Sequence, residues 1–149
     1  MTNRTYQIEM NEKQLLHLLD ALDLYSRLGM GQLEALDDWI RLKFQTYDAD
    51  GEGYDSDYIR KLFQNIKAEV WCHPPNGSWG IHNQRVPTSC REAYDIKQVL
   101  RKARHSARMQ DPNESEETKK WIRHTVDGDS YFPTNPDLPP VKCKVKTSE

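Results

Sequence analysis

The sequence contains no long apolar run. Its 149 residues are 36% hydrophobic and 30% charged, and the mean hydropathy is −0.91. No stretch approaches the roughly 18 apolar residues that a membrane-spanning helix needs. The opening residues MTNRTYQIEMNEK include no apolar segment of signal-peptide type. We therefore expect a cytoplasmic protein that does not enter a membrane, with a modest core that a second copy completes.

Cysteine is scarce, and the familiar catalytic motifs are missing. The odd number of cysteines (Cys72, Cys90 and Cys143) favours reduced thiols over a disulfide framework. No CxxC or HxxxH pair exists, so a zinc set made from these cysteines and His73 has little support. The sequence also has no phosphate-binding G-x-x-x-x-G-K, no G-x-S-x-G and no H-E-x-x-H. We predict no catalytic residue, no metal and no cofactor.

A strong charge of one sign is lacking as well. The net charge is −2 and the isoelectric point is about 6.2, which excludes a general DNA-coating protein. The charge is unevenly distributed, however. Residues 34–57 carry eight acids and two bases, whereas residues 85–109 carry seven bases and two acids. This local basic excess suits a compact anionic ligand better than a nucleic acid polymer.

Apolar residues at helical spacing predict four helices, at 12–28, 32–46, 57–71 and 89–109. Asn11 is a favourable N-cap for the first helix, and Thr88 or Ser89 for the fourth. The tail is expected to be β-like, with WIRHTV, a turn at Asp127-Gly128, SYFP and the alternating VKCKVK. We therefore predict an α+β fold, with a small antiparallel β element towards the C-terminus.

The chain is expected to form a single domain, 1–149. It divides into a helical N-terminal part (1–72), a ligand-pocket connector with a basic helix (73–110), and a loop with a β-like tail (111–149). The loop at 48–59, DADGEGYDSDYI, resembles a calcium loop of the EF-hand type. Its twelfth position is Ile59, where calcium binding requires a bidentate Glu, so we expect a polar loop without calcium.

The predicted helix 89–109 carries a stripe of basic residues. Tyr94 and His105 lie on its flank, and the stripe consists of Lys97, Arg101, Arg104 and Arg108. One interpretation is a phosphate or diphosphate site. The alternative is a solvated face, or a face that is ion-paired to the acidic segment 34–57. From the stripe alone, the alternative is the simpler interpretation.

The connector before this helix is the second candidate. Trp79 is followed by a glycine that allows close backbone approach, and then by Asn83 and Arg85. The connector leads into a helix N-terminus, which favours anions. Trp79 or Tyr94 could stack on a base. The alternative is structural, since Arg91 and Asp95 are spaced to pair locally.

Two stretches, LLDALDLYSRLGMGQLEAL (18–36) and SWGIHNQRVPTSCREAYDIKQVLR (78–101), resemble a family of small tailed-phage proteins. We connect this family to the first described Thoeris anti-defence proteins. These proteins are sponges that sequester the cyclic ADP-ribose signal of a bacterial immune system. The resemblance covers about a third of the chain, and neither the 48–57 loop nor the tail beyond 110 takes part in it.

The resemblance implies a non-catalytic binder that assembles as a dimer, and in some members as a hexamer. It implies a signal pocket at the dimer interface, built from an aromatic residue, an amide and arginines. Matched by motif position, these are Trp79 or Ile81, Asn83, Arg101, and Arg104 or His105. The family more often has an aromatic residue where this chain has Ile81. A separate site for cyclic di- and trinucleotides in some members would use Arg27.

The leading hypothesis is therefore a phage sponge for cyclic nucleotide signals in the cytoplasm of the infected bacterium. The candidate ligand-binding residues are Trp79, Ile81, Asn83, Arg85, Tyr94, Arg101, Arg104 and His105, with Arg27 at a second site. One alternative is a protein-interaction module that docks to and inhibits a host protein through its acidic region and leucine stripes. A nucleotide phosphodiesterase is the last alternative, because the sequence shows no usable metal-site spacing.

Overall fold

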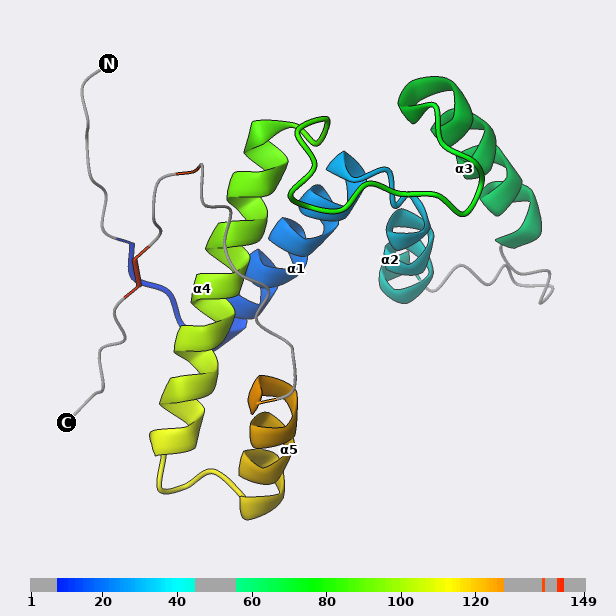
Figure 1. Ribbon diagram of the computed structural model, residues 1–149. Coiled ribbons are helices and arrows are strands. Elements are labelled where there is room, and N and C mark those ends of the chain that lie inside the picture. Colours follow the sequence, from blue (N-terminus) through cyan, green and yellow to red (C-terminus); the bar gives the residue numbers. More distant parts are fainter. Residues whose placement is uncertain (1–7, 45–55, 128–137, 139–141, 144–149) are drawn as a thin grey trace, which may run out of the picture.

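The computed structural model describes residues 8–44, 56–127, 138 and 142–143, and the regular secondary structure within them is entirely helical (Figure 1). The helices are α1 (Glu12–Gly29), α2 (Glu34–Phe44), α3 (Ser56–Trp71), α4 (Thr88–Gln110) and α5 (Glu116–Asp127). The four helices predicted from apolar spacing are confirmed to within two residues at each end. Within these residues, no helix is both long and apolar enough to cross a membrane.

The predicted α+β class is wrong, because the described residues form five helices and no strand. The segment WIRHTV, expected to be a strand, belongs to α5. Ser115 begins this helix: its hydroxyl accepts a hydrogen bond from the Thr118 backbone N–H at 3.1 Å. Ile122 is buried. Of the other expected strands, SYFP and most of VKCKVK lie outside the described residues.

The centre of the fold is the antiparallel packing of α1 against α4, which cross in Figure 1. Tyr25 near the end of α1 bonds Ser89 at the start of α4, with 2.9 Å between their hydroxyl oxygens. At the other end, Glu12 pairs with Arg104. The two helices are in close contact at Gly29, where an added Cβ would lie 2.5 Å from the Cys90 Cβ. Only glycine fits at this crossing.

The two expected helix caps have different outcomes. Asn11 caps α1 as predicted: it accepts from the Gln14 N–H, and the Gln14 side chain accepts from the Asn11 N–H, both at 2.9 Å. The expected cap of α4 by Thr88 or Ser89 is wrong. The N-cap is Pro87, which makes no side-chain hydrogen bond there. The Ser89 hydroxyl instead joins Tyr25, so tertiary packing takes precedence over capping.

The remaining helices attach to this pair in sequence. α5 folds back beside the C-terminal half of α4, α2 contacts α1, and α3 contacts only α2 among the helices (Figure 1). The Lys67 side chain holds α3 in place, with only 2% of its surface exposed. Its ammonium donates to Glu34 Oε1 at 2.8 Å and to the Pro75 carbonyl at 3.0 Å. These two acceptors compensate for burying the charge.

The crossing at Gly29 can be tested by substitution. Gly29→Ala is expected to lower the free energy of unfolding by about 1–3 kcal/mol, because the added methyl overlaps Cys90 across the helix pair. Urea unfolding measures the change. The matched control is Gly80→Ala, since a Cβ there has nothing within 4 Å. An equal effect of both substitutions would contradict the close crossing.

The N-cap of α5 at Ser115 provides a test that residues 116–127 form a helix. Ser115→Ala removes an N-cap and should cost about 1 kcal/mol of unfolding free energy. Ser106→Ala, at an exposed position inside α4, is the control and should change it by less than about 0.5 kcal/mol. Thermal and urea unfolding report both values. If residues 116–127 formed a strand, Ser115→Ala would behave like the control.

Candidate ligand-binding site

One end of the molecule gathers several of the residues predicted to bind a ligand. Here the C-terminus of α1 meets the N-terminus of α4, and the connector 73–87 crosses both. We call this end the junction. The Trp79 N–H donates to the Met30 carbonyl at 3.0 Å, which ties the connector to the end of α1. Beneath it lies the buried cluster of Met30, Ile81, Val86, Cys90 and Tyr94, against which Trp79 packs.

Trp79, Asn83 and Arg85 form one structural unit at the junction. The Arg85 guanidinium carbon lies 6.0 Å from the Trp79 ring centroid, at the outer range of a cation–π contact. The Asn83 side chain accepts from the Arg85 N–H at 2.9 Å and so shapes the turn. His73 meets the ring edge-on, with 4.8 Å between centroids. A base that stacks on Trp79 from the side of Arg85 must displace the guanidinium.

Ile81 and Tyr94 have a different environment from the one expected for ligand contacts. Both are core residues, with 8% and 7% of their surface exposed. The Tyr94 hydroxyl and Gln98 Oε1, one turn apart on α4, are buried without a hydrogen-bond partner in the described structure. Burial raises the pKa of Tyr94, and the nearby Gln98 amide and Arg101 oppose this only in part. Unpaired buried polar atoms are uncommon, and they leave hydrogen-bonding capacity unused.

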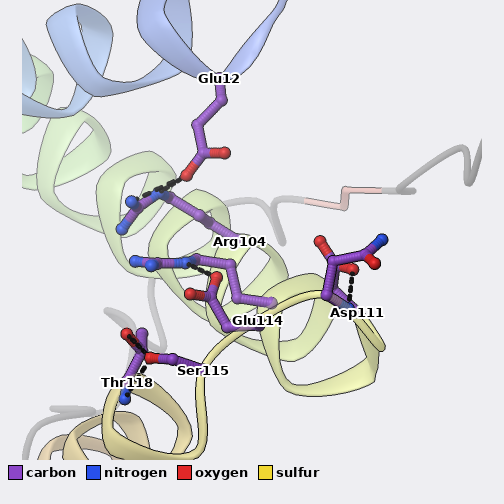
Figure 2. Close-up of polar contacts among 8 residues, drawn as sticks. Glu12, Arg104, Asp111, Glu114, Ser115 and Thr118 are labelled. Atoms are coloured by element: carbon purple, nitrogen blue, oxygen red, sulfur yellow. Dashed lines mark hydrogen bonds and ion pairs between the residues drawn. The ribbon is translucent and has the colours of Figure 1, made fainter.

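The basic stripe of α4 is largely neutralised by acids of the same chain. Lys97 pairs with Asp23, Arg104 with Glu12 at 2.8 Å, and Arg108 with Glu114 at 2.7 Å. Figure 2 shows the last two of these pairs, which follow one another along the same side of α4. The stripe is therefore ion-paired, as the alternative interpretation of the sequence proposed. The partners lie in α1 and before α5, however, and not in the acidic segment 34–57.

Asp23 lies at the centre of the α1–α4 contact. Burial raises its pKa, but hydrogen bonds and charges from Lys97 and Arg27 outweigh that effect, so its pKa lies below 3.8. The stripe extends away from the junction. Lys97 lies 5.9 Å from the centroid of the Tyr94 ring, at the edge of the junction, whereas Arg104 is ten residues beyond Tyr94, about 15 Å along the helix axis. One chain therefore does not bring Arg104 and Trp79 to a common pocket.

His105 is a buried residue of the α4–α5 contact. It is 5% exposed, and its ring meets Trp121 edge-on at 6.4 Å. Burial lowers its pKa below 6.5, and the charges of Arg101, Arg104 and Arg108 lower it further. The imidazole is therefore neutral at pH 7. It supplies no positive charge to a phosphate.

Arg27 reaches the junction from α1. It pairs with Asp23 at 2.8 Å, and its Nη1 donates to Gln32 Oε1 at 3.0 Å. The Gln32 amide in turn donates to the Ser78 hydroxyl at 3.4 Å, next to Trp79 in the chain. The residue predicted for a second site is thus linked to the connector of the first. The resemblance to the anti-defence family had implied two separate sites.

A groove of about 960 Å³ adjoins Arg27, within the usual range for small-ligand sites. It continues into an apolar pocket of about 370 Å³. The groove is lined by α1, α2, Lys67 of α3 and the connector, with Asp20, Asp23, Leu24, Arg27, Gln32, Glu34, Ala35, Asp38, Trp39, Leu42, Lys67, Asn76 and Ser78. Four carboxylates and two cations line the groove, and two of these carboxylates, Asp23 and Glu34, are ion-paired with Arg27 and Lys67.

Several groove residues were missed by sequence reasoning. Trp39 was interpreted only as part of an apolar helix face. Gln32 and Ser78 lie in the two stretches that carry the resemblance but were given no role, and Asn76 belonged to no motif. The adjacent acids Asp37 and Asp38 were a signal that Trp39 lies beside a polar surface. Within the described residues, no group of three or more His, Cys, Asp or Glu could hold a metal ion. Most of the calcium-like loop, 48–55, lies outside those residues.

Comparison with known proteins gives no match: no family model, no curated protein and no solved structure resembles this chain significantly. The resemblance to the Thoeris anti-defence proteins thus remains a prediction.

The buried His105 predicts a pH dependence of stability. Its folded pKa lies below the unfolded value of about 6.5, so the unfolded chain takes up its proton first as the pH falls. The free energy of unfolding should therefore decrease below pH 6.5, and the loss is complete below the folded pKa. His105→Gln should remove this part of the slope. Urea unfolding between pH 5 and 8 measures it, and an unchanged slope in the variant would contradict a neutral, buried His105.

Proposed function

We propose that this protein is a non-catalytic binder that sequesters a small cyclic nucleotide signal. One observation carries the proposal: the junction holds an indole, an amide and a guanidinium on one turn, at Trp79, Asn83 and Arg85. Arg27 is linked to the same end through Gln32. The cellular setting follows the resemblance, with a phage protein acting in the cytoplasm of an infected bacterium.

The chemistry of these groups suits such a ligand. A guanidinium can donate two parallel hydrogen bonds to a phosphate, and an indole offers a stacking face for a base. Arg85 is exposed and has no ion pair among the described residues. It is therefore available to an anion at little cost. The ion-paired Arg104 and Arg108 are available only if Glu12 and Glu114 are displaced.

The proposed binder acts as a homo-oligomer. In one chain, Arg104 and Arg108 lie beyond the junction end of α4 and are held by Glu12 and Glu114. A second copy could supply the missing positive charge at the junction. The core favours the same conclusion, because large apolar side chains including Leu42, Tyr58 and Val70 remain more than half exposed.

A second candidate function is docking to a host protein. The groove beside Arg27 supports it, because carboxylates surround Trp39 and the exposed Leu42. An acidic, partly apolar groove complements a basic peptide segment better than it does a diphosphate. The partner expected on this account is a positively charged segment of a protein.

A thermal-shift screen tests the nucleotide proposal, with cyclic ADP-ribose isomers and cyclic di- and trinucleotides as probes. A ligand at about 100 times its dissociation constant adds about 2.7 kcal/mol, which raises the melting temperature by several degrees. Arg85→Ala should reduce the shift. Arg123→Ala, an exposed arginine on α5, is the matched control and should preserve it.

The fate of the ligand separates the alternatives. Heating the complex should release the nucleotide intact, and a cleaved product would instead support a phosphodiesterase. The absence of a shift with every nucleotide would contradict the proposal. Binding of a lysine-rich peptide that Asp38→Asn weakens would then favour the docking function.

A further inference from the structure

The outer face of α3 carries an unusual row of exposed apolar side chains. Tyr58, Leu62, Ile66 and Val70 follow one another at intervals of four residues, and 58%, 39%, 46% and 64% of their respective surfaces are exposed. Residues at this spacing lie on one side of a helix. We call this set the outer row. Isolated exposed apolar residues are ordinary, but a continuous row along a whole helix marks an interaction surface.

The attachment of α3 explains why this row points outward. The neighbouring row on α3 (Ile59, Phe63, Lys67 and Trp71) is buried or half-buried. Within it, Lys67 is fixed between Glu34 and the Pro75 carbonyl. These two hydrogen bonds of Lys67 turn its row of α3 towards α2, and the outer row is exposed. Figure 1 shows α3 at the edge of the molecule, beyond α2.

A polar row runs along the other side of the outer row, at Asp57, Lys61, Asn65 and Glu69. Lys61 and Glu69 are both exposed, and neither has an ion-pair partner within the described residues. They are eight residues apart, placed symmetrically about Asn65. The outer row is centred at nearly the same place, between Leu62 and Ile66. Such a helix face is complementary to an inverted copy of itself.

We propose that α3 is a self-association face, on which a second copy of this chain lies antiparallel across a two-fold axis. In this arrangement Leu62 meets Ile66 of the second copy, and Tyr58 meets its Val70. Lys61 then lies beside Glu69 of the second copy, twice by symmetry. A parallel pairing would place the two polar rows on opposite sides of the contact and leave these charges unpaired. The charge pattern therefore selects the antiparallel copy.

Pairing through α3 would form the homo-oligomer proposed above, and it does not depend on the identity of the ligand. α3 has 16 residues and is about 24 Å long. One helix face is small beside the roughly 800 Å² per partner of a standard interface. We therefore expect a dimer whose population rises with protein concentration.

Charge reversal on the full chain tests the pairing, with sedimentation velocity over a concentration series and without nucleotide. Lys61→Glu alone and Glu69→Lys alone should each weaken the dimer about tenfold or more at low salt, because each places like charges opposite one another twice. An equimolar mixture of the two variants should restore it, since every contact in the mixed dimer is then attractive. Circular dichroism confirms that each variant is folded.

The matched control is Arg60→Glu, which makes the same charge change at an exposed position of α3 outside both rows. It should leave the dimer unchanged, whereas Ile66→Glu should abolish it. A wild-type chain that stays monomeric at high concentration would overturn the proposal, as would a dimer that tolerates Ile66→Glu. Failure of the mixture to recover dimers would overturn the antiparallel pairing. Because no nucleotide is present, these results are independent of the ligand screen.

Discussion

The crossing of α1 and α4 at Gly29 and Cys90 is the contact on which the rest of the structure depends. The absence of a side chain at Gly29 allows the two backbones to approach, and the ion pairs along the helices hold their antiparallel alignment. α2 continues from the end of α1, and the connector is bonded to Met30 at that same end. The junction therefore forms only if the crossing forms. α3 and α5 are attached to this frame and do not create it.

This frame also determines where charge is available. The basic stripe of α4 was a candidate phosphate site, but three of its four cations bind α1 or the chain before α5. The same residues cannot be counted both as structural ion pairs and as a preformed phosphate site. Arg85 differs, because it lies on the connector and covers an indole instead of meeting a carboxylate. The positive charge that a ligand could meet is thus at the junction, and a binder of anions would be expected to use it there.

Local signals predicted much of the fold. Asn11 and the leucine stripe placed α1 correctly, and apolar residues at helical spacing correctly separated α3 from α4. α5 was missed because the short segment WIRHTV fits both a two-residue and a helical period. The cap at Ser115 was the signal that could have decided between them. The turn of the connector was recognised as a candidate site, whereas the groove was not, because its lining comes from α1, α2, α3 and the connector together. Contacts between distant segments leave no local pattern in a sequence.

The most direct test of ligand binding at the junction is a titration of the isotope-labelled protein with cyclic ADP-ribose isomers. Backbone and indole amide chemical shifts report the residues that respond. If the ligand binds at the junction, the largest chemical-shift changes occur at Trp79 and residues 80–86, with smaller ones at Arg27. Changes concentrated at residues 101–108 would contradict it, because they would place the ligand on the ion-paired stripe of α4. A spectrum that no isomer alters would contradict cyclic ADP-ribose as the ligand.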